Sequence, residues 1–227
     1  IYPSSLNGNY QLSNTMDFYN PYDDPLGQEE KLTKLFKDAI EQSYEEDSIE
    51  FSKYDLVVVF HAGIGQDFSL PFLDPTPEDI PSTYIDEDMI QEHLGESNII
   101  VGNHAIQKGI ILPETQNHLL YDISETMFSD AENPCEYQYG ITGTFSLMIG
   151  FAIGLPPLWN IQTGESGVGV FGLMDQGSNN GRGIIPAPPT AWSRIYAGWE
   201  NYVIGELGSE YHIPTRRENS IIKVPIR

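Results

Sequence analysis

Residues Ile141 to Pro156 read ITGTFSLMIGFAIGLP, and this segment is the most informative about the fold. Its length, the glycine at position 154 and the prolines that follow favour a helix that ends at that glycine. Apolar residues occupy nearly every position of the segment. We therefore expect a helix over 141–153 that is buried on all sides and lies at the centre of the core.

Regular elements are also predicted on both sides of this segment. Residues 28–44 carry apolar side chains at helical spacing and predict an amphipathic helix. The β-branched run over 54–63, YDLVVVFHAG, predicts a buried central strand. Residues 99–101 and 110–112 predict two short strands that could pair as a hairpin. Residues 190–207 predict a short helix and residues 220–227 a strand, whereas 64–96 and 164–189 are expected to be long loops rich in Pro or Gly.

The charge balance excludes several classes of partner. The chain has 227 residues with 11 Lys and Arg against 33 Asp and Glu, a net charge of −22 at pH 7. Such a chain repels phosphate, so nucleic acid and anionic membrane surfaces are not expected partners. No apolar stretch reaches the roughly 20 residues of a membrane-spanning helix. With Cys135 as the single cysteine, neither an intrachain disulfide nor a cysteine-based zinc site can form.

Three blocks near the C-terminus carry a family resemblance. They read GLPPLWN over 154–160, GLMDQGS over 172–178 and AWSRIYAGW over 191–199. Together with the strand that ends in His61-Ala62-Gly63, they resemble the secreted zinc metallopeptidases of the immune-inhibitor-A type, which are zincins. The resemblance covers roughly residues 10–227. It implies an α/β fold in which a mixed twisted sheet packs against the 28–44 and 141–153 helices, with long loops around them.

The same resemblance locates a zinc site whose ligands are missing here. In that family the helix carries H-E-x-x-H and leads directly into a Gly-Leu-Pro turn, because two imidazoles four residues apart can hold one zinc ion while the glutamate acts as general base. Those positions fall on Leu147, Met148 and Phe151, and the acidic third ligand falls on Pro157. Met174 matches the methionine that lies under the metal. Apolar side chains cannot hold a hydrolytic zinc ion.

We therefore expect a metallopeptidase-like chain whose zinc site has become part of the core, without catalytic residues and without a cofactor other than calcium. The expected role is a non-catalytic structural or binding module, located outside the cell or on its surface, in a filament or other assembly. We expect one domain over 1–227, as a fragment of a longer polypeptide. A protein partner or self-assembly is then expected, and peptide binding in the former substrate groove stays open. The alternative is a secreted hydrolase with relocated metal ligands.

Other residues are candidates for a metal, catalytic or interface site. Carboxylates over 74–88 offer oxygen ligands for calcium, with Asp74, Asp79, Asp86 and Asp88 as candidates, although a solvated acidic loop is the plainer interpretation. A weaker calcium candidate consists of Asp175, Asn179 and Asn180. The five histidines lack the spacing of a zinc pair, Ser166 lacks the context of a serine nucleophile, and Cys135 is more typical of an inert thiol. An aromatic interface is expected at the N-terminus, from Tyr2, Tyr10, Phe18, Tyr19 and Tyr22.

Overall fold

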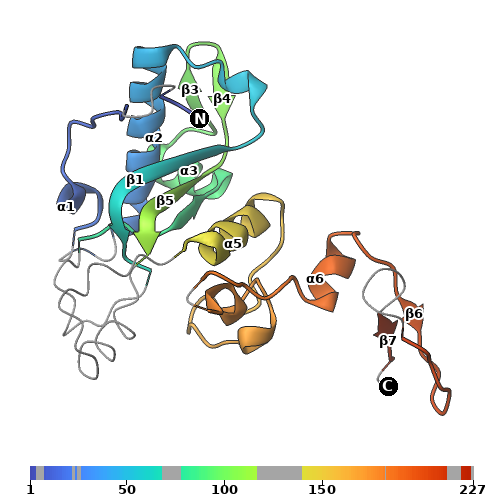
Figure 1. Ribbon diagram of the computed structural model, residues 1–227. Helices are drawn as coiled ribbons and strands as arrows, with labels where there is room; N and C mark the ends of the chain where they lie inside the picture. Colours follow the sequence, from blue (N-terminus) through green and yellow to red (C-terminus); the bar gives the residue numbers. More distant parts are fainter. Residues whose placement is uncertain are drawn as a thin grey trace, which may run out of the picture.

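The computed structural model describes residues 1–3, 8–21, 24, 27–67, 78–116, 140–181, 183–213 and 221–225. Its largest sheet has three strands in the order β1 (Val57–Gly65), β5 (Gly109–Gln116) and β2 (Thr83–Ile85). Strand β1 runs parallel to β5, and β2 runs antiparallel to it. The chain is therefore mixed α/β with a mixed sheet, as the sequence predicts at that level (Figure 1).

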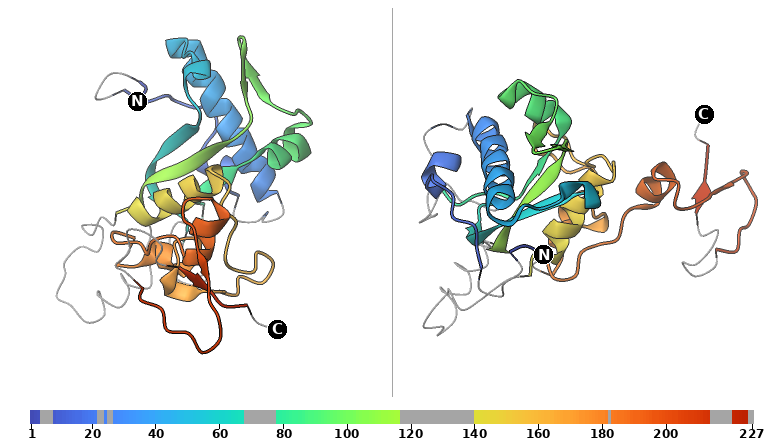
Figure 2. Two further views of the ribbon diagram at one scale, coloured as in Figure 1. Left: turned by 90° about the vertical axis from the view of Figure 1, so that its right-hand side faces the viewer. Right: turned by 90° about the horizontal axis from the view of Figure 1, so that it is seen from above.

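Helices cover both faces of this sheet (Figures 1 and 2). Helix α2 (Gln28–Asp47) and helix α3 (Glu87–Leu94) pack on one face, where Phe36 and Ile90 share a buried cluster with Ile111 of β5. Helix α5 (Thr142–Ala152) packs on the other face, through Met148 against Ile110 of β5. Successive side chains of β5 point to opposite faces of the sheet, so this strand contributes to two separate cores.

The remaining elements are short. They are α1 (Met16–Tyr19), η1 (Phe51–Lys53), the hairpin of β3 (Ile99–Val101) and β4 (His104–Ile106), η3 (Gly169–Phe171), η4 (Gln176–Asn179), α6 (Ala191–Tyr196), β6 (Val203–Ile204) and β7 (Ile222–Lys223). Figure 1 and the right-hand view of Figure 2 show that α6, β6 and β7 project away from the body formed by the sheet and its helices. Among the described helices, none combines the length and apolar character needed to cross a membrane.

The strands predicted over 54–63, 99–101 and 110–112 form, but their predicted pairing is wrong, and β2 lies in a segment predicted to be a loop. Strand β1 lies at an edge of the sheet, with half-buried valines, whereas β5 is the central strand and is buried from Gly109 to Pro113. The predicted hairpin of 99–101 with 110–112 is also wrong, because β3 pairs with β4 while 110–112 belongs to β5. A β-branched run indicates a strand but does not indicate its neighbours.

Two helix predictions also need correction. Part of the predicted 64–96 loop is helix α3, which Asp86 caps by accepting a hydrogen bond from the Met89 N–H at 2.9 Å and which Gly95 ends in a left-handed conformation. Helix α5 forms where predicted but is not buried on all sides. Phe145 is 37% exposed, and Ile153 just beyond the helix is 57% exposed. One flank of this apolar helix therefore faces outward.

The N-terminal aromatic residues contact their own chain. Tyr19 is buried and donates a hydrogen bond to Asp38 of α2 at 2.7 Å, and Tyr10 donates to Asp47 of α2 at 2.6 Å. Burial, followed by the bond to Asp38, raises the pKa of Tyr19 to about 12. The other described members, Tyr2 and Phe18, contact Tyr54 and Lys31 respectively. The expected interface role of this cluster gains no support from these contacts, and Tyr22 lies outside the described residues.

A close approach at the start of α5 gives a first prediction. The Gly143 N–H donates to the Gly183 carbonyl at 2.7 Å, and a Cβ at Gly143 would overlap the carbonyl oxygen of Ser178. Because backbone atoms must move to make room, we expect Gly143→Ala to lower the free energy of unfolding by about 1–3 kcal/mol. Gly140→Ala, whose Cβ would first meet Ile184 at 3.3 Å, is the milder control in urea unfolding. Equal stability of the two variants would contradict this packing.

Candidate functional site

The candidate site is the C-terminal end of α5 and the turn that follows it. Gly154 adopts a positive φ of 89°, which an L side chain rarely adopts. Its N–H donates to the Phe151 carbonyl at 2.9 Å, and the Leu155 N–H reaches back to the Gly150 carbonyl at 2.9 Å. These bonds close the helix and turn the chain, so that the buried Leu155 lies against α5. The predicted helix stop at Gly154 is confirmed.

One face of α5 meets Met174. Leu147 and Phe151 are four residues apart, so they share a helical face, and both pack against the buried cluster of Leu155, Leu173 and Met174. Met174 is fully buried. A Cβ at Gly150 would lie only 2.5 Å from the Met174 sulfur, so the methionine fills the space that this glycine leaves under the helix.

The other positions that correspond to the expected zinc motif do not all lie on this face of α5. Met148 points to the sheet and packs with Ile110 and Leu112 of β5. Phe151 packs against both the Met148 cluster and the Met174 cluster. Its ring stacks on the Tyr84 ring, with 6.1 Å between the ring centroids, and meets the Trp159 ring edge-on, with 5.8 Å between the centroids. Pro157 is half-buried after the turn. Leu147, Phe151 and Met174 therefore lie together in apolar packing, while Met148 belongs to a different cluster.

Beside Met174, the carboxylate of Asp175 sits in a ring of hydrogen-bond donors. Its Oδ2 accepts from the Ser166 hydroxyl at 2.9 Å and from three successive backbone N–H groups, those of residues 167, 168 and 169, at 3.0, 2.7 and 2.9 Å. Its Oδ1 accepts from the Gln176 N–H at 2.8 Å. Asp175 thus serves as the anion of a backbone nest that ties loop 166–169 to the start of η4.

This arrangement bears on two sequence interpretations, the weaker calcium candidate at Asp175 and the role of Ser166. Burial alone would raise the pKa of Asp175, but the hydrogen bonds from Val168, Ser166, Gln176 and Gly169 outweigh it and hold the pKa below its usual value. Donors surround the carboxylate, which is an anion site within the protein and not the arrangement of a calcium ligand. Asn180, from the same calcium candidate, donates its side-chain N–H to the Val170 carbonyl. Ser166 has a structural role in the same nest.

A second buried polar network joins the sheet to α5. Asp67 accepts from the Ser82 N–H at 2.7 Å, from the Ser82 hydroxyl at 2.6 Å and from the side-chain amide of Gln116. The Gln116 side-chain oxygen accepts from the Thr144 hydroxyl of α5 at 2.6 Å. Burial, which the bonds from Ser82 and Gln116 only partly offset, raises the pKa of Asp67. This network is not predictable from the sequence, because no short-range spacing links its members.

The raised pKa of Asp67 predicts how the stability of the Asp67→Asn variant depends on pH. A carboxyl group whose pKa is higher in the folded state costs stability while it is ionised, and this cost falls as the pH drops through the folded pKa. We therefore expect the stability of the variant relative to the wild type to be highest at alkaline pH and to decline as the pH falls through the folded pKa toward the unfolded value of about 3.9. Paired urea titrations at several pH values measure this difference. A constant difference across that range would contradict the assignment, and Asp67→Ala, which leaves Ser82 and Gln116 unpaired, should be less stable throughout.

The calcium candidates of the acidic segment are not gathered in the described residues. Asp86 is engaged as the α3 cap, Asp88 is exposed on the first turn of that helix, and Asp74 lies outside the description. Asp79 accepts a hydrogen bond from Asn20 through its backbone carbonyl. Over the described ranges, no group of three or more His, Cys, Asp or Glu side chains could hold a metal ion. The calcium site stays a prediction.

The histidines lie on separate elements. The ring nitrogens of His61 on β1 lie 3.0 and 3.1 Å from the carbonyls of Ala62 and Ile80. His93 on α3 lies 3.6 Å from Glu29, and His104 on β4 packs against Tyr44 and Phe51. The remaining described histidine, His212, is exposed. His118 and Cys135 fall outside the described residues.

Comparison with family models, with curated proteins and with solved structures found no match for this chain. The assignment of function therefore depends on the chemistry of the α5 site.

Proposed function

We propose that this chain is a metallopeptidase-like module without catalytic activity, a pseudopeptidase, and that it serves a structural or binding role in an extracellular assembly. The observation that carries the proposal is the packing of Leu147 and Phe151 against the buried cluster that contains Met174, on the helical face where the resembled family would hold its zinc. None of these side chains offers the imidazole or carboxylate that hydrolytic zinc requires.

The zincin-like fold is part of this proposal. It is supported by a helix that ends in the Gly154-Leu155-Pro156 turn, by a methionine lying under that helix, and by a mixed sheet on the opposite side of it. The extracellular location rests on the resemblance to secreted proteins. The charge of −22 disfavours nucleic acid as a partner, so another protein or a further copy of the chain is the proposed partner.

The free energies of burying apolar and polar side chains explain how such a site stays folded without metal. A buried apolar side chain contributes about 1.5–3 kcal/mol relative to exposure, whereas a buried imidazole or carboxylate without a metal or hydrogen-bond partner costs free energy. Leu147 and Phe151 at the two histidine positions, with Met148 at the position of the general base, make a metal-independent core of this site.

Peptide cleavage tests the proposal. We expect the full chain to leave unfolded casein and a fluorogenic peptide library uncut, with added zinc and with chelator alike. Cleavage above the buffer rate that zinc supports and chelator abolishes would contradict the proposal and favour the relocated-ligand alternative. Cleavage insensitive to chelator would also contradict it, because it would require another catalytic group.

A further inference from the structure

The buried network at the end of β5 places a hydroxyl group beside a carboxamide. Gln116 is the last residue of β5, Thr144 lies in the first turn of α5, and the two residues are only 3% and 5% exposed. The Thr144 hydroxyl donates to the Gln116 Oε1 at 2.6 Å. Because Oε1 is bonded to the carbonyl carbon Cδ, the hydroxyl oxygen already lies beside an electrophilic carbon. Two packed elements hold this pair, and such fixed proximity accounts for a large part of the acceleration of a reaction.

Asp67 contacts the nitrogen of the same carboxamide. The Gln116 Nε2 donates to the Asp67 Oδ2, and Ser82 holds this carboxyl group through its N–H and its hydroxyl. Burial raises the pKa of Asp67, so the carboxyl group keeps a proton at a higher pH than an exposed aspartate does. An amide nitrogen is a poor leaving group until it is protonated. Asp67 lies where a general acid could supply that proton.

The start of α5 favours the charge that attack on this carbonyl would produce. Addition of a hydroxyl oxygen to Cδ places negative charge on the Gln116 Oε1. This oxygen lies against the first turn of an 11-residue helix, through its hydrogen bond with Thr144. The N-terminal end of a helix carries a partial positive charge, and a fixed dipole of this kind stabilises a developing oxyanion.

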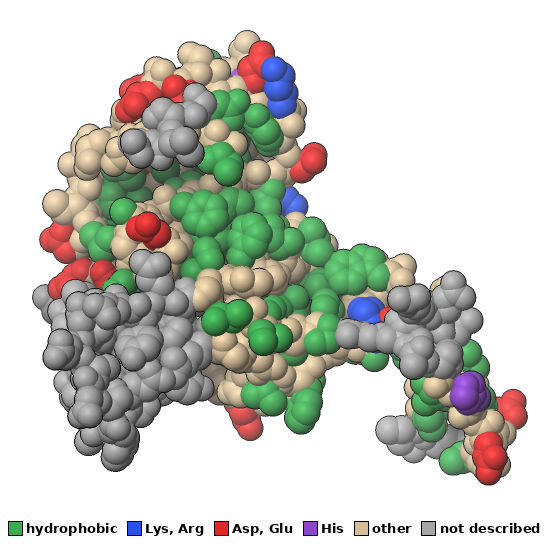
Figure 3. All heavy atoms as spheres, viewed as in Figure 1, with side chains coloured by type: hydrophobic (Ala, Val, Ile, Leu, Met, Phe, Trp, Pro, Cys, Tyr) green, Lys and Arg blue, Asp and Glu red, His purple; other side chains and the backbone are tan. Residues whose placement is uncertain are grey.

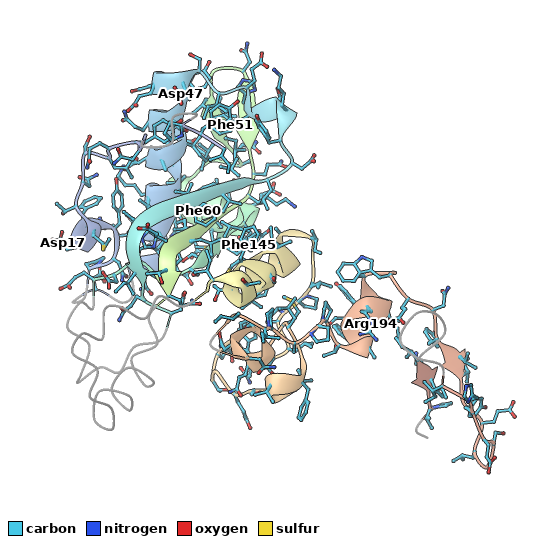
Figure 4. All side chains as sticks on the ribbon, viewed as in Figure 1. Asp17, Asp47, Phe51, Phe60, Phe145 and Arg194 are labelled. Carbon is cyan, nitrogen blue, oxygen red and sulfur yellow. The ribbon has the colours of Figure 1, made fainter. Side chains whose placement is uncertain are left out.

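Apolar side chains border the junction of the sheet with α5. Phe145, which follows Thr144 in α5, packs near Phe60 of β1, with 6.4 Å between the ring centroids. Figure 4 shows these two side chains on the same side of the body, and Figure 3 shows hydrophobic side chains gathered there. Together with the burial of Gln116 and Thr144, these surroundings limit the access of water, which would otherwise compete with the hydroxyl for Cδ.

We propose that Thr144 and Gln116 join in an intramolecular ester that links α5 to β5. The Thr144 Oγ attacks the Gln116 Cδ, so that the Oγ–Cδ bond forms and the Cδ–Nε2 bond breaks. Asp67 gives its proton to Nε2, which leaves as ammonia, and the proton of the Thr144 hydroxyl returns to Asp67. One hydroxyl and one carboxamide thus become one ester and one ammonia, without an oxidant, a reductant or another reactant.

This cross-link goes beyond the proposed function and does not depend on it. The reaction takes place once within the chain and cuts no peptide. Cys135 is the single cysteine, so this chain cannot form an intrachain disulfide. An ester between positions 28 residues apart would supply a covalent cross-link by other chemistry. Like a disulfide, such a link stabilises a protein mainly by restricting its unfolded chain.

Mass spectrometry of the purified full chain tests the inference. We expect an intact mass lower than that of the sequence by one ammonia and, after digestion, a peptide pair that links residue 116 to residue 144. Thr144→Val keeps the side-chain shape without the hydroxyl and should have the unmodified mass. Asp67→Asn lacks the acid, so intact masses recorded over time should show ester formation slowed by about 100-fold or more. Ser146→Ala, which removes the hydroxyl that donates to the Thr142 carbonyl of the same helix, is the matched control and should be linked as the wild type is.

Other results would overturn the inference. A wild-type chain of unmodified mass, with no linked peptide pair, would show that the pair is only hydrogen-bonded. Loss of ammonia that persists in Thr144→Val would assign the loss to other residues, and an undiminished rate in Asp67→Asn would contradict the proton transfer. The linked pair is sought in the wild type itself, so the result does not depend on whether Thr144→Val folds. Thr144→Ser, which keeps the hydroxyl, should still form the link.

Discussion

Replacement of Asp175 by asparagine is expected to lower the free energy of unfolding by about 3–5 kcal/mol, because hydrogen bonds to a charged partner contribute about 1.5–3 kcal/mol each. The asparagine side chain keeps the size but replaces one acceptor oxygen by a donor. Five groups donate to the carboxylate, and four of them converge on Oδ2. Whichever way the amide turns, at least one buried N–H then faces another donor.

Urea unfolding of the wild type and the variant measures the effect. Glu165→Gln, an exposed carboxylate near the same loop, is the matched control and should stay within about 0.5 kcal/mol of the wild type. A similarly small change for Asp175→Asn would contradict the role of this nest.

The pH dependence of unfolding provides an independent measure of how much Asp175 contributes to stability. The folded pKa of Asp175 lies below its usual value, so its contribution is complete above the unfolded value of about 3.9 and is lost as the pH falls through the folded pKa. The stability difference between the wild type and Asp175→Asn should therefore shrink as the pH is lowered below about 4. A stability difference between the two proteins that grows on acidification would contradict the lowered pKa of Asp175.

Restoring two imidazoles on α5 is the second change with a large expected effect. In the absence of metal, Leu147→His combined with Phe151→His removes two packed apolar side chains and should destabilise the chain by about 2–5 kcal/mol. Two histidines four residues apart share a helical face and can bind one zinc ion. Zinc at 100 times its dissociation constant should then recover about 2.7 kcal/mol.

A second double variant controls for metal binding without pairing. Leu147→His combined with Ile149→His introduces the same two side chains at positions that do not face each other on a helix. Thermal unfolding with and without zinc compares the two proteins. Equal stabilisation of both by zinc, or no stabilisation of the first, would contradict the assignment of positions 147 and 151 to one metal-facing side.

Elements with strong local periodicity were predictable from the sequence. Leu32, Leu35, Phe36 and Ile40 define one face of α2, and the helix forms over Gln28–Asp47 as that spacing indicates. Helix α3 was missed because its eight residues are mostly polar and only Ile90 is buried. The sequence signals that indicate this helix are Asp86 as its N-terminal cap and Gly95 as its stop.

The errors about burial have a shared cause. The runs at 57–60 and 110–112 are equally apolar, yet β1 lies at an edge and β5 lies in the centre. Likewise, the composition of α5 does not indicate that Phe145 faces outward. Burial depends on which elements become neighbours, and these contacts are between residues far apart in the sequence.

The candidate site was predicted in part. The turn at Gly154 was predicted from the sequence, and the structure places Met174 beneath α5. The nest around Asp175 was instead interpreted as a weak calcium site, because its donors are backbone N–H groups that the sequence does not display. The glycines at 167 and 169 opposite a buried aspartate are the signal that could have indicated it.

Zinc content together with its effect on stability tests the central claim most directly. Elemental analysis of the purified full chain should find far less than one zinc per chain, and thermal unfolding should give the same midpoint with and without a strong chelator. About one zinc per chain, whose removal lowers the midpoint, would contradict the proposal that the packing of Leu147 and Phe151 against the cluster of Met174 stands in place of a metal centre.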